Sequence, residues 1–102
     1  MDAKLKERFD NETTGNKVVV YMKGTAMAPM CGFSAQVAGI LQSLNVKFHD
    51  VNVLADAEIR EGIKQYTNWP TIPQIFIDGK FVGGCDILTE LHQKGELAKM
   101  VK

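Results

Sequence analysis

Apolar runs and helically spaced apolar residues alternate along the first two thirds of the chain. The β-branched and aromatic run at 18–22 predicts a strand buried on both faces, at the centre of a sheet. Apolar residues then recur at helical spacing over 33–44, and alternating apolar residues at 46–50 predict a second strand. A further helix is predicted to begin at Asp56. This strand–helix–strand–helix order indicates the beginning of an α/β fold.

The pattern changes to a hairpin in the last third of the chain. Two short apolar runs, at 74–77 and 80–82, are joined by Asp78-Gly79, a dipeptide favoured in tight turns, so these two strands are predicted to be antiparallel. After Gly83-Gly84, a helix is predicted over 86–93. Its expected inner face consists of Ile87, Leu88 and Leu91.

Short helices are predicted at both ends. Leu5 and Phe9 lie four positions apart among charged residues, which predicts a peripheral amphipathic helix ended by the turn-forming residues 11–15. Near the other end, a short helix is predicted to begin at Glu96. It is expected to bury Leu97, Met100 or Val101.

Composition places the chain among small globular proteins. It has 102 residues, of which 45% are hydrophobic and 24% charged, so residues 1–102 are expected to form one domain. The 12 basic residues balance the 12 acidic ones, which argues against nucleic-acid binding. The charged first residues do not resemble a signal peptide, and no apolar run is long enough to span a membrane. We therefore expect a cytoplasmic protein, or one of the mitochondrial matrix or plastid if a targeting peptide has been removed.

The two cysteines, Cys31 and Cys85, are too few for a disulfide-bonded scaffold or a four-thiolate zinc site. Cys31 lies where a loop meets a predicted helix, so unpaired backbone N–H groups and the helix dipole favour its thiolate. It is a candidate nucleophile or metal ligand, and a buried, inert cysteine is the alternative. Ser34 stands where a dithiol motif has its second cysteine, so a reactive Cys31 needs an external thiol or further metal ligands.

Three further groups of residues each allow a functional and a structural interpretation. The Ile72–Pro73 bond could be cis, turning the Ile72 backbone outward to bind a peptide, or an ordinary trans bond that begins an edge strand. The helix N-terminus near Asp86 could hold a carboxylate, or Asp86 could be a plain N-cap. Lys23 lies within reach of the Cys31 loop, although a lone lysine is usually solvated.

Several separated motifs stand out along the chain. They are Met22-Lys23-Gly24-Thr25, Pro29-Met30-Cys31-Gly32-Phe33-Ser34, Asn68-Trp69-Pro70-Thr71-Ile72-Pro73-Gln74, Asp78-Gly79 and Val82-Gly83-Gly84-Cys85-Asp86. In this order and spacing they resemble the monothiol glutaredoxins of the Cys-Gly-Phe-Ser class, and the similarity runs from Val18 to Val101. The resemblance implies an α/β, thioredoxin-like fold: a four-stranded mixed β-sheet flanked by helices, with a cis bond before Pro73.

The resemblance also implies a glutathione site. Lys23 and Arg60 would bind the glycine carboxylate of glutathione, and Ile72 would exchange main-chain hydrogen bonds with its cysteine residue. The γ-glutamyl end would be received by the backbone N–H of Cys85 and the carboxylate of Asp86. These roles are physically reasonable, because two cations offset one carboxylate and a strand-like edge binds a peptide.

In the family that the chain resembles, the holo form is a [2Fe–2S] cluster that bridges two subunits. Its ligands would be Cys31 of two chains and two glutathione thiols, which together supply the thiolates that such a cluster uses. The implied function is transfer of the cluster to apo iron–sulfur proteins in cluster assembly and iron homeostasis, with a second copy and BolA-type proteins as partners. Ala26 departs from the family pattern, which usually has proline there, and a more flexible loop is expected.

Two other functions stay open. Cys31 could serve a glutathione-dependent thiol–disulfide oxidoreductase that removes glutathione from mixed disulfides. The chain would then be an enzyme of the glutaredoxin type, with weak disulfide reductase activity. It could also be a regulatory module that only binds partner proteins.

Overall fold

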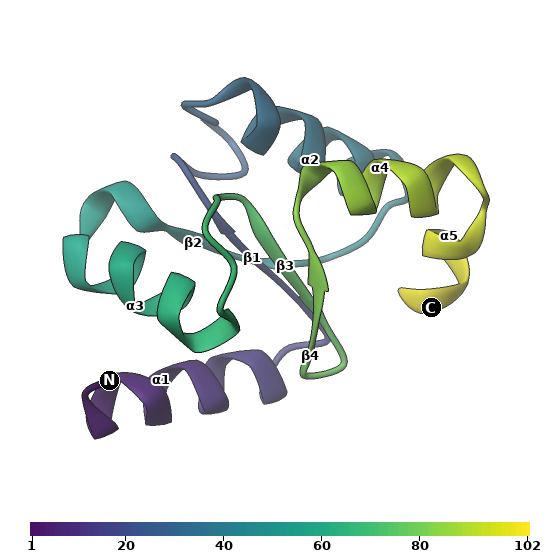
Figure 1. Ribbon diagram of the computed structural model, residues 1–102. Helices are drawn as coiled ribbons and strands as arrows, with labels where there is room; N and C mark the ends of the chain where they lie inside the picture. The colour runs from purple at the N-terminus through teal and green to yellow at the C-terminus, as the bar shows by residue number, and fades with distance from the viewer.

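The computed structural model describes residues 1–102 as a succession of short helices and strands (Figure 1). In chain order these are α1 (Ala3–Thr14), β1 (Val18–Met22), α2 (Gly32–Ser43), β2 (His49–Asn52), the 3-10 helix η1 (Val53–Ala55), α3 (Ala57–Thr67), β3 (Gln74–Ile77), β4 (Lys80–Gly83), α4 (Cys85–Gln93) and α5 (Glu96–Met100). None of the helices is long and apolar enough to cross a membrane.

The strands form one mixed sheet in the order β2-β1-β3-β4. β1 pairs in parallel with β2 and antiparallel with β3, which pairs antiparallel with β4. Val20, in the middle of β1, lies opposite Asp50 on one side and Ile75 on the other. Asp78 and Gly79 join β3 to β4 with φ angles of 54° and 78°, the left-handed conformation that tight hairpin turns use. The predicted four-stranded mixed sheet and its hairpin are confirmed.

Helices cover both faces of this sheet (Figure 1). α1 and α3 pack together on one face, while α2, α4 and α5 lie on the other. β1 separates two apolar clusters, because alternate side chains point to opposite faces. Val18, Val20 and Met22 belong to the first cluster, and Val19 and Tyr21 belong to the second. All of β1 is buried, which confirms the prediction of a strand buried on both faces.

α1 is part of the core and longer than the hydrophobic pattern predicts. Phe9 is fully buried, and its ring contacts those of Tyr21 and Tyr66 at centroid distances of 5.7 Å and 5.2 Å. The helix continues through most of the turn-forming residues, where the hydroxyl of buried Thr13 donates to the Phe9 carbonyl at 2.8 Å. The prediction of a peripheral helix is wrong, because packing against the second cluster outweighs the weak helix propensity of these residues.

Three other predictions also need correction. β2 begins at His49, whereas Val46 and Phe48 pack on the first apolar cluster without pairing to β1. α4 begins at Cys85 instead of the residue after it. Ile87, predicted to face inward, is 39% exposed. An apolar pattern alone therefore does not determine strand pairing, the first residue of a helix or the burial of each apolar side chain.

Candidate functional site

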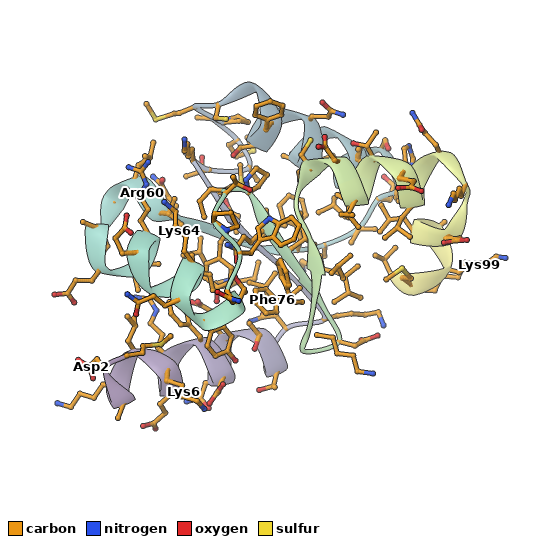
Figure 2. The ribbon with its side chains drawn as sticks, viewed as in Figure 1. Asp2, Lys6, Arg60, Lys64, Phe76 and Lys99 are labelled. Atoms are coloured by element: carbon orange, nitrogen blue, oxygen red, sulfur yellow. The ribbon has the colours of Figure 1, made fainter.

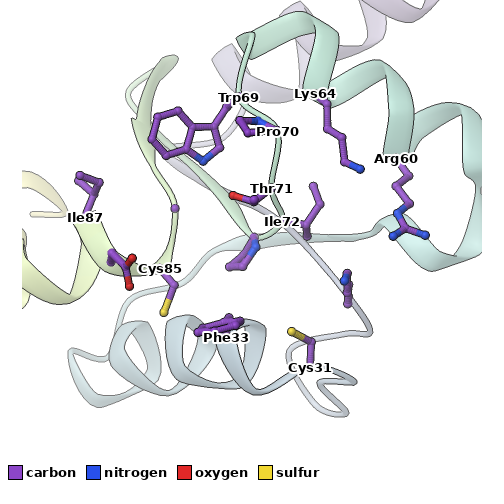
Figure 3. A pocket seen from close by; sticks show the side chains of 14 residues that line it. Cys31, Phe33, Arg60, Lys64, Trp69, Pro70, Thr71, Ile72, Cys85 and Ile87 are labelled. Atoms are coloured by element: carbon purple, nitrogen blue, oxygen red, sulfur yellow. The ribbon is translucent and has the colours of Figure 1, made fainter.

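A pocket of about 570 Å³ opens among the N-termini of α2 and α4, helix α3 and the segment before β3 (Figure 3). All of the predicted site residues line it: Lys23, Cys31, Arg60, Ile72, Cys85 and Asp86. The other lining residues, which were not predicted to bind a ligand, are Phe33, Lys64, Trp69, Pro70, Thr71, Pro73, Gly84 and Ile87. The fold therefore gathers separate stretches of sequence at one concave surface.

Cys31 directly precedes the first residue of α2, and its backbone is extended, with φ at −152°. The backbone N–H of Ser34 lowers the pKa of the Cys31 thiol, and the Phe33 N–H, the Lys23 charge and the Ser34 hydroxyl act in the same direction. These groups stabilise a negative sulfur at the start of a helix. The thiol is half-buried and faces the pocket (Figure 3). This setting favours a reactive cysteine over an inert one.

The loop between β1 and α2 folds back on itself. Gly24 and Pro29 form an isolated bridge, and the Met30 N–H donates to the Lys23 carbonyl at 2.9 Å. Gly24 has a φ of +86°, and a Cβ at this position would lie 2.7 Å from the Met30 nitrogen. Only glycine fits both the backbone conformation and the close approach.

Two side chains of β2 hold this loop from outside. Oδ1 of Asn52 accepts hydrogen bonds from the N–H groups of Gly24 and Leu54, both at 3.0 Å. Oδ2 of Asp50 accepts one from the Ala26 N–H at 2.7 Å. Proline has no N–H, so Ala26 gives the loop an attachment that the usual family residue cannot make.

Three cationic side chains from two parts of the chain line the pocket. Arg60 and Lys64 project from α3 one turn apart (Figure 2), and Lys23 directly follows β1. Nε of Arg60 is buried without a hydrogen-bond partner, and neither Arg60 nor Lys23 forms an ion pair within the chain. A buried donor without a partner is costly, so this surface suits an anionic ligand. The i, i+4 spacing from Arg60 is the signal that would have identified Lys64.

The segment before β3 presents unpaired backbone to the pocket. The Ile72–Pro73 bond is cis, so the trans alternative is wrong. Neither the N–H nor the C=O of Ile72 forms a hydrogen bond within the chain. The fully buried amide of Gln74 fixes the segment by donating to the carbonyls of Trp69 and Thr71, at 3.0 Å and 3.2 Å. A fixed, unpaired backbone edge can pair with an extended peptide.

The N-terminus of α4 forms another wall of the pocket (Figure 3). Gly84 caps this helix and Asp86 is its second residue, so the interpretation of Asp86 as a plain N-cap is wrong. Burial raises the pKa of the Cys85 thiol, and the Thr89 hydroxyl opposes this only in part. Unpaired N–H groups at a helix start attract anions, whereas the Asp86 carboxylate attracts cations. This wall therefore suits a group that carries both charges.

Large apolar side chains border the pocket and were not predicted as site residues. Phe33 is 61% exposed and Trp69 is 36% exposed. The Trp69 ring packs edge-on against Phe81 at a centroid distance of 5.7 Å. Ile87 lies on the same border, which explains why it does not face the core.

The chain is similar in sequence and in fold to known proteins. A profile of the family described as Glutaredoxin matches residues 18–82. The chain is 55% identical over 102 residues to an uncharacterized monothiol glutaredoxin ycf64-like of Synechocystis sp., covering 100% of this chain and 95% of the relative. It is 50% identical over 98 residues to the chloroplastic monothiol glutaredoxin-S14 of Arabidopsis thaliana, covering 96% of this chain and 57% of that protein. The solution structure of reduced poplar apo GrxS14 is similar with a TM-score of 0.83 at 50% identity, covering 95% of this chain and 89% of the other.

Proposed function

Because this chain belongs to the glutaredoxin family and is a monothiol glutaredoxin with a thioredoxin-like fold, we propose that its pocket binds glutathione beside Cys31. Two copies then carry a [2Fe–2S] cluster between them and pass it to apo iron–sulfur proteins, in cluster assembly and iron homeostasis. The observation that carries this proposal is a single thiol with a lowered pKa at the edge of a cationic pocket.

Each end of the pocket matches one end of glutathione. Lys23 and Arg60 bind the glycine carboxylate, and the buried Arg60 Nε gains the partner that it lacks in the chain. The free N–H and C=O of Ile72 pair with the backbone of the cysteine residue, as an added strand would. The Cys85 N–H and the Asp86 carboxylate receive the γ-glutamyl carboxylate and ammonium.

The thiols of this chain fit a shared cluster better than one held by a single chain. No group of three or more His, Cys, Asp or Glu side chains is arranged to hold a metal ion. Only Cys31 has a lowered thiol pKa, since burial raises that of Cys85. Cys31 from each of two chains, with one glutathione on each, supplies the four thiolates that such a cluster uses. Ligands that exchange with solution favour delivery of the cluster over its storage.

Anaerobic reconstitution with iron, sulfide and glutathione tests this proposal. We expect a coloured dimer with the visible spectrum of a [2Fe–2S] centre, which requires both Cys31 and glutathione. Cys31→Ser should abolish it, whereas Cys85→Ser, which removes the other thiol of the same pocket, should retain it. A Cys31→Ser protein that binds as much cluster as the wild type would overturn the proposal.

The lowered pKa of Cys31 also favours a second function, removal of glutathione from mixed disulfides. The Cys31 thiolate attacks the glutathione sulfur of the mixed disulfide, and the substrate thiolate leaves and takes up a proton. A second glutathione thiolate then attacks the sulfur of glutathione bound to Cys31, which releases oxidised glutathione and restores the Cys31 thiolate. Rapid turnover of a glutathionylated peptide by a protein that binds no cluster would favour this function.

We further propose BolA-type proteins and apo iron–sulfur proteins as partners. The balance of 12 basic and 12 acidic residues provides no general attraction for nucleic acid, and no membrane partner is proposed. The cytoplasm stays the predicted compartment, or the mitochondrial matrix or plastid for an imported chain. Partner binding that survives the loss of both glutathione and cluster would instead identify a regulatory module.

A further inference from the structure

We propose that Asn52 is a positioning residue of this pocket, one that fixes Lys23 relative to Arg60. The inference rests on the proposed function, because it concerns how these two cations share one carboxylate. Its basis is one side-chain oxygen, Oδ1 of Asn52, which accepts two backbone hydrogen bonds of 3.0 Å each.

These two hydrogen bonds join the segments that carry the cations. One donor is the N–H of Gly24, the residue directly after Lys23. The other is the N–H of Leu54 in η1, which leads into α3 and so to Arg60. A shift of either segment would change the separation of the two cations. The oxygen of Asn52 therefore fixes the distance between the two cations that would bind one carboxylate.

The sheet aims the Asn52 side chain at this junction. Asn52 pairs with Met22, the last residue of β1, which places it next to the point where Lys23 leaves the sheet. Its neighbour Val51 is buried in the second apolar cluster. Because successive side chains of a strand point to opposite faces of the sheet, the Asn52 side chain points to the face opposite that cluster. The position of the bridge thus follows from the register between β1 and β2.

No other hydrogen bond of the loop makes this connection. The Lys23 N–H donates to Oγ of Ser34 at 3.1 Å, and its carbonyl accepts from Met30, both within the β1–α2 region. Asp50 holds Ala26 at 2.7 Å but has no second partner toward α3. Loss of Asn52 should therefore affect recognition of the glycine carboxylate and spare recognition of the γ-glutamyl end.

Calorimetric titration with glutathione and with its C-terminal glycine amide, which lacks only that carboxylate charge, separates these effects. We expect the wild type to prefer glutathione. Asn52→Ala should weaken glutathione binding about 5- to 10-fold, because displaced cations lose part of their charge-assisted hydrogen bonding to the glycine carboxylate, and amide binding less than about 2-fold. Asn11→Ala, on the exposed surface of α1, is the control and should change neither affinity.

Equal losses for both ligands, or no loss for either, overturn the inference while the glutathione site itself stands. A wild-type protein that fails to bind glutathione, or fails to distinguish it from the amide, overturns the proposed function as well. Amide hydrogen exchange of the wild type covers the case in which Asn52→Ala does not fold. The N–H groups of Gly24 and Leu54 should both be protected, and unprotected exchange at either one overturns the bridge.

Discussion

Cys31 and Cys85 line the same pocket, and both lie at a helix N-terminus, yet their thiols differ in chemistry. Backbone N–H donors lower the pKa of Cys31, whereas burial raises the pKa of Cys85. Position at a helix start therefore does not decide the protonation state by itself, because burial disfavours the charged form. Over the pH range between the two pKa values, the pocket holds one thiolate and one neutral thiol.

Ser34→Ala should raise the pKa of Cys31. The fully buried Ser34 hydroxyl helps to lower that pKa and also accepts a hydrogen bond from the Lys23 N–H at 3.1 Å. Without this hydroxyl the Cys31 thiolate is less stable, so a smaller fraction of Cys31 is in the reactive thiolate form at a pH below its pKa. The backbone N–H of Ser34, the main cause of the lowered pKa, is retained, so the rate of alkylation by iodoacetamide at neutral pH should fall only about 2- to 3-fold, with the whole pH–rate profile moved to higher pH.

Ser43→Ala is the matched control for this substitution. Ser43 lies on the same helix, and its hydroxyl donates only to the Ile40 carbonyl, at 2.6 Å. Its pH–rate profile should equal that of the wild type. An unshifted profile for Ser34→Ala would show that the backbone donors alone determine the pKa of Cys31.

At the scale of elements, the sequence predicts those strands and turns whose conformation depends on adjacent residues. The run of β1 and the Asp78-Gly79 turn each carry their signal in adjacent positions, and both are confirmed. The start of β2 was missed because Val46 and Phe48 are apolar for packing, whereas the strand is defined by pairing with β1. Contacts between distant segments determine where such a strand begins, so a local sequence pattern does not predict it.

In the candidate site, too, some residues could be predicted from the local sequence and others depend on the folded structure. The helix-start position made Cys31 a candidate from local physics, whereas Arg60 was found only through the order of the family motifs. Lys64 was missed although its spacing from Arg60 on α3 was available. The bridge made by Asn52 joins it to Gly24, 28 positions away, and depends on the register of the folded sheet.

Phe9→Ala should lower the free energy of unfolding by about 3–5 kcal/mol, the usual loss for a large buried aromatic residue. Phe9 is fully buried, and it holds α1 against β1 through Tyr21 and against α3 through Tyr66. Urea unfolding followed by circular dichroism measures the change.

Phe33→Ala provides the comparison, since Phe33 is 61% exposed at the border of the pocket. Its effect on the free energy of unfolding should be less than about 1 kcal/mol. Equal losses from the two phenylalanine substitutions would contradict the assignment of α1 to the core.

At the scale of the whole molecule, charge is balanced overall and concentrated locally. The chain has 12 basic and 12 acidic residues, and several ion pairs join residues three or four positions apart along the chain. Lys23 and Arg60 are outside these pairs and line the pocket. Attraction of an anion is therefore a property of this surface and owes little to the field of the whole protein.

Glutathione binding should weaken as salt is added, while the stability of the fold changes little. The Debye length falls from about 30 Å at 0.01 M to about 8 Å at 0.15 M, so we expect a loss of affinity of about 3- to 10-fold. Surface ion pairs contribute little to stability, so the thermal midpoint should hardly move. Titration calorimetry over a series of sodium chloride concentrations measures how glutathione affinity depends on salt.

Arg60→Gln removes one cation of the pocket and should make the salt dependence shallower. An affinity that does not respond to salt in the wild type would contradict charge recognition by Lys23 and Arg60.

Trp69 is the only tryptophan of the chain, and it stands in the wall of the pocket. The two tyrosines contact Phe9 in the core, on the side covered by α1. Light at wavelengths that tyrosine does not absorb therefore excites a single indole, and its emission comes from the pocket alone. The molecule carries a built-in optical probe, and entry or departure of a ligand can be followed in real time on the unlabelled protein.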